Sequence, residues 1–293
     1  MRMSSLKPAT RWVGACMAAA GALLLTTSQA QAETLDCTST TYVCTGEGST
    51  TFEFNGVSYT EFAGALWSLT MIQPTGTGYI DPFVRIQDKG EESGQNTSNP
   101  DLPEDEKAGL WTHDLSTSDV PIIHIIDETT GAYTGSYYEF LLDINEPNGT
   151  KNSLLSLDGL QLCVSDVGNV TSVDGDYRCE PQPYFYNLDE SDPDTWVKLD
   201  YDLNSGSGSG DLLVYIPTDL LDISESKFLY LWSHFGVNDA SGDGFEEWAV
   251  HVRQGGDPPF PLNPVPEPAS LVLLGSGLIA GAGALRRRNR QRK

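Results

Sequence analysis

The chain has 293 residues, with 17 Lys and Arg side chains against 41 Asp and Glu side chains, and a formal net charge of −24. Residues 33–265 hold all but one of the acids and fewer than half of the bases. A section this acidic repels nucleic-acid phosphates and anionic lipid head groups, which excludes both as general partners. Aromatic and aliphatic residues recur along it, so the composition favours a folded body over a disordered one.

Residues 1–32 have the pattern of an export signal. Three bases precede an apolar segment at residues 13–25, and Ala-Gln-Ala at residues 30–32 is a small-x-small cleavage pattern. We therefore expect an N-terminal signal helix that is removed before Glu33. The alternative is an uncleaved membrane anchor, although the apolar segment is shorter than the ~20 residues that span a bilayer.

Residues 33–254 are expected to form one mainly β body. Nine short runs are rich in aromatic or β-branched residues and are bounded by Gly, Pro, Asn or Asp, which is typical of strands. In the last run, Trp248 and Val250 alternate with Ala249 and His251, which predicts one buried and one solvent-facing side. The pattern predicts an antiparallel β-sandwich of jelly-roll type. The runs are residues 51–54, 83–86, 122–126, 137–144, 160–164, 196–199, 212–216, 228–232 and 248–252.

Three other segments of the body are less regular. Residues 60–69 (TEFAGALWSL) fit either a short helix or a strand. Residues 88–109 are polar, contain Gly, Asn, Pro and acids, and are predicted to form a long loop. Residues 255–264 (GGDPPFPLNP) form a Pro- and Gly-rich spacer between the body and the C-terminal tail.

Five cysteines occur, and Cys16 would leave with the signal segment. The remaining four are an even number in an exported chain, which indicates disulfides. Four cysteines allow three pairings, of which we favour the one that is local in sequence, Cys37–Cys44 and Cys163–Cys179. The alternative is a zinc site, but the spacings lack a CxxC pair and no His lies near either pair.

The sequence contains none of the catalytic motifs that we sought. It has no GxSxG nucleophile elbow, no HExxH metal motif and no phosphate-binding loop. Three of its four histidines fall in or beside strand-like runs, and paired carboxylates carry no information in so acidic a chain. We therefore expect no catalytic residues and no enzymatic activity.

One acidic stretch near the end of the body matches part of a calcium-binding loop. Asp239, Ser241 and Asp243 alternate before a glycine, and Glu247 falls at the ninth position of such a loop. The twelfth position holds Val250 instead of the bidentate Glu, which excludes a helical EF-hand. The hypothesis is a β-hairpin calcium loop, and the alternative is an acidic turn with no ligand, because Asn, Asp, Ser and Gly are also turn formers.

The C-terminal tail, residues 265–293, has three parts in order. Pro266, Glu267 and Pro268 precede an uncharged apolar segment at residues 269–285, and the Arg-rich sequence RRRNRQRK follows. The apolar segment is at the short edge of the range for a single transmembrane helix, and the bases after it would stay on the cytoplasmic side. The alternative is a plain membrane anchor with a chance Pro-Glu-Pro sequence.

The tail resembles the PEP-CTERM sorting tail of Gram-negative bacteria. The resemblance implies processing by an exosortase, a membrane protease, after transient anchoring in the inner membrane through residues 269–285. It implies a final location at the cell surface or outside the cell, and it implies no enzymatic activity, because the bodies of such proteins differ widely.

Together these observations predict an exported surface or extracellular-matrix protein with a structural or adhesive role. Extracellular polysaccharide is a candidate partner, and calcium is the only candidate cofactor. The alternative is a secreted carbohydrate-binding module or carbohydrate-active enzyme. Exposed tryptophans beside a cleft with two carboxylates would favour that alternative, whereas fully buried tryptophans would favour the structural role.

Overall fold

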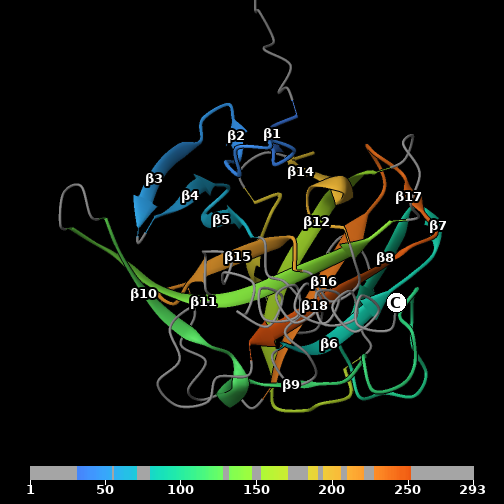
Figure 1. Ribbon diagram of the computed structural model, residues 1–293. Helices are drawn as coiled ribbons and strands as arrows, with labels where there is room; N and C mark the ends of the chain where they lie inside the picture. Colours follow the sequence, from blue (N-terminus) through green and yellow to red (C-terminus); the bar gives the residue numbers. More distant parts are fainter. Residues whose placement is uncertain are drawn as a thin grey trace, which may run out of the picture. The chain divides into compact units, whose positions relative to one another are not determined.

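Two β-sheets form most of the part of the chain that the computed structural model describes (Figure 1). The described residues are 32–54, 56–70, 80–127, 132–146, 153–170, 184–190, 194–205, 210–220 and 228–251. The predicted signal helix and the predicted transmembrane helix lie outside these residues. Among the helices of the described ranges, none has the length and apolar character that crossing a membrane requires.

The first sheet is antiparallel except for one parallel pair, β1 with β14. Its order is β2 (Thr45–Gly46), β1 (Thr34–Asp36), β14 (Trp196–Asp200), β12 (Leu154–Ser165), β16 (Phe228–Phe235) and β8 (Glu92–Gln95), while β13 (Tyr184–Asn187) pairs with β12 and β9 (Leu115–Ser116) with β16.

The second sheet is antiparallel throughout its described strands. Its order is β3 (Thr50–Phe54), β4 (Val57–Phe62), β5 (Ala65–Leu69), β15 (Leu212–Pro217), β11 (Ala132–Asn145), β18 (Phe245–His251) and β6 (Ile80–Ile86), and β10 (Ile122–Asp127) pairs with β11. A small separate sheet pairs β7 (Lys89–Gly90) with β17 (Ser241–Gly242). Two short 3-10 turns, η1 (Thr117–Asp119) and η2 (Tyr201–Leu203), complete the described elements.

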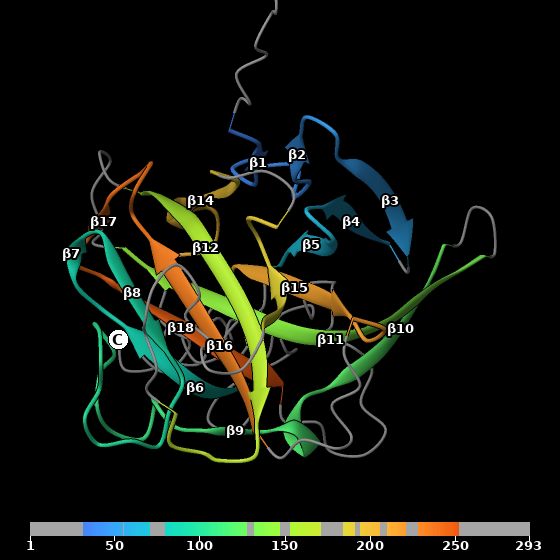
Figure 2. The ribbon, with the colours of Figure 1, turned by 180° about the vertical axis from the view of Figure 1, so that it is seen from behind.

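The two large sheets enclose one hydrophobic core, which makes the body a β-sandwich. Buried side chains from both sheets, including Leu162 and Leu231 of the first and Phe140 and Trp248 of the second, belong to one cluster. In both views of the ribbon, β12 and β16 cross β11 and β15 instead of running alongside them (Figure 2). Burial of this apolar surface is the main favourable contribution to folding.

The prediction of a mainly β, antiparallel body is confirmed. Each of the nine predicted runs falls on a strand of the described residues, although the last one ends where the described range ends, at residue 251. β-Branched and aromatic side chains suit a pleated surface that packs on both faces, which is why this pattern predicted strands. The jelly-roll connection stays a prediction.

The structure selects the strand alternative for residues 60–69 and corrects the loop predicted at residues 88–109. Residues 60–69 contain no helix, because they contribute to a hairpin in which a turn at Ala63 and Gly64 joins β4 to β5. The predicted loop at residues 88–109 contains β7 and β8, and β8 completes an edge of the first sheet. The polar side chains of β8 hide its strand character from any pattern based on hydrophobicity.

The prediction that Ala249 faces solvent is wrong. Ala249 is fully buried in a second hydrophobic cluster, with Leu141 of the adjacent β11 and Leu213 and Tyr215 of β15, the next strand along. β18 lies between β11 and β6, and the second sheet buries apolar side chains on both faces at this position. Alanine is only weakly hydrophobic, so its presence in the sequence does not indicate whether that face of the strand is buried.

The described cysteines are disulfide-bonded. Cys37 and Cys44 form the predicted local disulfide, which joins β1 to the segment that leads into β2. Cys163 of β12 is disulfide-bonded as well. Its predicted partner, Cys179, lies outside the described residues.

Candidate functional site

A group of buried acidic side chains lies at the end of the sandwich where the small sheet of β7 and β17 pairs. Its members are Glu92 of β8, Glu146 directly after β11, and Glu246 of β18, which are 1 %, 3 % and 0 % exposed. We call these three residues the interior acidic cluster. Figures 1 and 2 both show β7, β8 and β17 together at this end of the body. Buried acids without a paired base are uncommon, so the cluster calls for a physical explanation.

Strand register places two of these side chains between the sheets. Glu246 pairs with Ile86 of β6 and Ile144 of β11, and both isoleucines belong to the central core. Because cross-strand partners share a face, the side chain of Glu246 points into the sandwich. Glu92, on the first sheet, is opposite Phe235 of β16, which is also a core residue.

Backbone amides hold two of the carboxyl groups in place. One oxygen of Glu146 accepts a hydrogen bond from the Gly242 amide at 2.8 Å. One oxygen of Glu92 accepts from the Asp88 amide. The hydroxyl of Ser241 donates to the Asp88 carbonyl at 3.2 Å and also interacts with the Glu146 carboxyl group. The β7–β17 pair therefore supplies polar partners on one side of the cluster.

The other carboxyl oxygens of the cluster have no partner among the described residues. These buried atoms are Glu92 Oε1, Glu146 Oε1 and both oxygens of Glu246. The Glu246 and Glu92 carboxyl groups lie close enough to share a proton whenever one of them is protonated. Two facing carboxylates offer only acceptors, so neither can satisfy the other without a proton or a cation between them.

Burial and repulsion between neighbouring carboxylates raise the pKa values of Glu246 and Glu146. Burial raises the pKa of Glu246 well above its ordinary value, and the hydrogen bond that protonated Glu246 can donate to Glu92, with the charges of Glu92, Glu146 and Asp143, raises it further. Burial also raises the pKa of Glu146 to about 7, against the stabilising hydrogen bond from Gly242. The pKa of each of these two groups therefore depends on the charge of its neighbours in the cluster.

Two glycines allow the surrounding loops to approach closely. A Cβ atom on Gly236 would lie 1.9 Å from the Gly90 carbonyl oxygen, and one on Gly244 would lie 1.6 Å from the Asn145 carbonyl oxygen. No side chain fits at either position unless the backbone moves. These contacts fix the loop before β18 against β7 and against the end of β11, which keeps the cluster closed.

The structure disperses the four residues of the sequence-predicted calcium loop. Asp239 lies 3.8 Å from Lys198, and its amide donates to the Ser156 hydroxyl. Asp243 is exposed, and Glu247 forms an ion pair with Arg85. Ser241 alone among the four contacts the interior acidic cluster, through Glu146.

The sequence pattern missed the interior acidic cluster, although one signal was present. The alternation that assigns Trp248 and Val250 to the buried face also places Glu246 on that face. Glu92 and Glu146 come from distant parts of the chain, so no local spacing brings them together. As the side chains stand, no three His, Cys, Asp or Glu residues of the described ranges form a ready metal-binding group.

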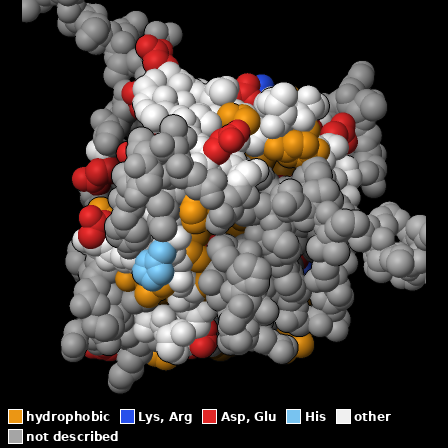
Figure 3. All heavy atoms as spheres, turned by 60° about the vertical axis from the view of Figure 1, so that its left-hand side comes forward, with side chains coloured by type: hydrophobic (Ala, Val, Ile, Leu, Met, Phe, Trp, Pro, Cys, Tyr) orange, Lys and Arg blue, Asp and Glu red, His pale blue; other side chains and the backbone are white. Residues whose placement is uncertain are grey.

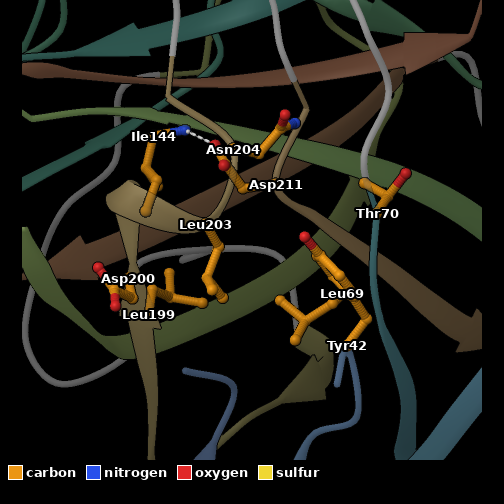
Figure 4. A pocket seen from close by; sticks show the side chains of 9 residues that line it. All are labelled: Tyr42, Leu69, Thr70, Ile144, Leu199, Asp200, Leu203, Asn204 and Asp211. Carbon is orange, nitrogen blue, oxygen red and sulfur yellow. Dashed lines mark hydrogen bonds between the residues drawn. The ribbon is translucent and has the colours of Figure 1, made fainter. Parts of the chain in front are cut away.

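A small cavity lies elsewhere in the described body, between the two sheets. Its lining includes Leu69, Thr70, Asn204 and Asp211, and its volume is about 10 Å³, which suits about one water molecule (Figure 4). Asp211 accepts a hydrogen bond from the Ile144 amide at 2.8 Å, while its other oxygen and the Thr70 hydroxyl have no partner in the described part of the chain. The cavity is far too small for a sugar ring.

One aromatic side chain is accessible beside a buried ion pair. Trp111 is 43 % exposed, whereas Trp67, Trp232 and Trp248 are buried. The guanidinium carbon of Arg85 lies 4.1 Å from the centre of the Trp111 ring. Trp196 of β14 is half-buried, so three of the five described tryptophans are core residues and Trp111 is the most exposed one.

Comparison with known proteins identifies the C-terminal tail. Residues 264–288 match the model of the PEP-CTERM protein-sorting motif. No curated protein and no solved structure matches the chain. The match agrees with the resemblance seen in the sequence, it covers only the tail, and it implies export and processing by an exosortase. The chain is therefore a β-sandwich body followed by a tail that carries the PEP-CTERM protein-sorting motif.

Proposed function

We propose that the protein is a non-enzymatic component of the cell surface or the extracellular matrix of a Gram-negative bacterium, with a structural or adhesive role. The observation that carries the proposal is the sorting motif at residues 264–288. In this proposal the signal segment directs export of the chain. Residues 269–285 then anchor it transiently in the inner membrane until an exosortase removes the anchor. The mature body is then released or attached outside the cell.

Two features of the body support this location. Cys37, Cys44 and Cys163 are all disulfide-bonded, which suits an oxidising compartment outside the cytoplasm. On the face in Figure 3, acidic side chains are scattered singly among the described atoms, and Lys or Arg side chains are hardly visible. An acidic surface of this kind resists association with nucleic acid and with anionic membranes.

The sorting route is tested by the covalent ends of the mature protein. Intact-mass and C-terminal peptide analysis of the protein from its native cells should give a chain that begins at Glu33 and ends near Pro266–Pro268. A matched variant, with alanine in place of Pro266, Glu267 and Pro268, should stay in the membrane fraction at full length. A wild-type chain that runs intact to Lys293 in that fraction would contradict exosortase processing.

The structural or adhesive role needs its own test. Deletion of the gene should reduce cell aggregation or matrix retention, and the wild-type chain should restore it. The Pro-Glu-Pro variant should not restore it, because the body would not reach the outside. Equal restoration by both chains would show that the body acts without sorting.

A second candidate function is the binding of extracellular polysaccharide, and Trp111 is the observation that favours it. An exposed tryptophan ring offers a flat apolar face of the kind on which sugar rings stack, and Arg85 holds this ring from one side. Replacement of Trp111 by alanine should abolish retardation of the protein in polysaccharide-containing gels. Replacement of the exposed Leu110 is the matched control, and unchanged retardation in both variants would exclude this surface.

A further inference from the structure

The interior acidic cluster lacks a compensating positive charge. Four of its buried carboxyl oxygens have no hydrogen-bond partner in the described part of the chain, and both oxygens of the fully buried Glu246 are among them. The ion pairs between described residues involve Arg85, Lys198 and His234, and none reaches Glu92, Glu146 or Glu246. Three buried carboxyl groups side by side are stable only when protons or a cation compensate their charge.

The chemistry of the cluster points to a hard divalent cation. Its donors are all oxygens, with three carboxyl groups and the Ser241 hydroxyl, and no His or Cys contributes. The Ser241 hydroxyl has one proton, which the Asp88 carbonyl or the Glu146 carboxyl group accepts, and in either case a lone pair of its oxygen remains for a cation. Ca²⁺ takes six to eight oxygen ligands in irregular geometry, whereas Mg²⁺ demands a near-octahedral set and usually keeps several waters.

We propose that Glu92, Glu146 and Glu246 bind one Ca²⁺ ion between the two sheets, with the Ser241 hydroxyl as a neutral ligand. The two carboxyl groups held by the Asp88 and Gly242 amides stay in position through one oxygen each and turn the free oxygen toward the ion. The side chains do not converge on a metal as they stand, so binding requires these carboxyl groups to move toward the ion.

The ion would join three parts of the fold that otherwise repel one another here. Glu92 belongs to the first sheet, Glu246 to the second, and Glu146 is bonded to the small sheet through Gly242. Binding to the native state alone stabilises that state by mass action. Calcium should therefore raise the unfolding temperature of the body and tighten its packing at this end.

The test uses the full-length chain, purified with a mild detergent for its apolar C-terminal segment and freed of metal with a chelator. Thermal melting and isothermal titration calorimetry are followed as CaCl₂ is added up to about 5 mM, since extracellular calcium modules bind in the range of about 10⁻⁴ to 10⁻³ M. The wild-type chain should bind one ion, and its melting temperature should rise by several degrees.

The variants Glu246→Gln and Glu92→Gln should each lose the calcium response. Loss of a residue that only orients a metal ligand typically lowers metal affinity by roughly 10–100-fold. Loss of a ligand itself should lower the calcium affinity by at least as much. Both variants should still fold, and without calcium they should melt at or above the wild-type temperature, because each replaces a buried acid with a neutral side chain. If one of them fails to fold, the other decides the question.

The control variant is Asp243→Asn, which alters the exposed loop that the sequence pattern indicated and keeps a residue that tolerates its positive φ of 82°. Its calcium response should equal that of the wild-type chain. The proposal is overturned if calcium changes neither the melting temperature nor the heat of titration. It is also overturned if the response survives in both Gln variants, or if Asp243→Asn alone removes it.

Discussion

Arg85 and Glu247 form a nearly buried ion pair on the outer side of β6 and β18. The Arg85 Nε atom donates to Glu247 Oε1 at 2.6 Å, and the guanidinium carbon lies 4.2 Å from the centre of the Phe245 ring. The side chains are 19 % and 5 % exposed. Arg85 therefore compensates the charge of Glu247, whereas Glu246 points to the opposite face of β18 and has no such partner among the ion pairs of the described residues.

Loss of Arg85 should destabilise the body. The variant Arg85→Met keeps much of the side-chain volume but leaves the Glu247 carboxylate buried and unpaired, which should lower the free energy of unfolding by about 3 kcal/mol. Urea unfolding at neutral pH measures the change. The double variant Arg85→Met with Glu247→Gln should recover part of the loss, since no buried charge remains. A loss below about 1 kcal/mol in the single variant would mean that the pair is effectively solvated.

Removal of the Cys37–Cys44 disulfide should lower stability moderately. The two cysteines are separated by seven positions, so the chain-entropy estimate for this short loop is about 2 kcal/mol. The double variant Cys37→Ser with Cys44→Ser is compared with the wild-type chain by urea unfolding. Both cysteines are buried in the core, so Cys37→Ala with Cys44→Ala is the control for the burial of hydroxyl groups. Equal stability of all three chains would show that the loop is already ordered in the unfolded state.

Asp189 should make the stability of the body depend on pH. Burial raises its pKa from 3.8 to about 6, although the Thr195 amide donates to its carboxylate. Between these two values the folded state holds a proton that the unfolded state releases, so this group's contribution to stability falls as pH rises and is level above about 6. Asp189→Asn keeps the acceptor for Thr195 and should remove this slope. Urea unfolding of both chains at several pH values from about 4 to about 7 tests it, and a constant difference between them would refute the assignment.

Asp211→Asn should stabilise the body at neutral pH. Burial raises the pKa of Asp211 well above its ordinary value, and the charge of Asp143 adds to the effect. An asparagine keeps the oxygen that accepts from the Ile144 amide and carries no charge. The gain should be about 1–2 kcal/mol in thermal melting. The exposed variant Asp202→Asn should stay within about 0.5 kcal/mol of wild type, and an equal effect of both variants would argue against a buried charge.

The sequence pattern was sufficient for strands whose own side chains are apolar. β12 and β15 contain runs of buried aliphatic residues, so their type could be predicted without knowledge of their neighbours. β8 could not, because its sequence ESGQ is polar and it is a strand only through pairing with β16. The Cys37–Cys44 pair was predictable for a different reason, because its two partners are close in the sequence.

The interior acidic cluster could be predicted only in part. Glu246 follows from the alternation of β18, but its neighbours Glu92 and Glu146 are far from it in the sequence. The local pattern predicted a calcium ligand at Asp243, because tight turns and calcium-binding loops are rich in the same residues, Asp, Asn, Ser and Gly. What separates the two cases is burial, which depends on the packing of both sheets.

The position of β18 has a consequence for the order in which the chain folds. β18 is the last described strand, yet it lies between β11 and β6. β11 can pair earlier with β10 and β15, but β6 joins the described second sheet only through β18. Pairings over such long sequence separations form slowly, because the loop entropy is lost before the contacts are gained. A chain that emerges N-terminus first cannot close its second sheet until nearly the whole body has emerged. Only the spacer and the sorting tail then remain to follow.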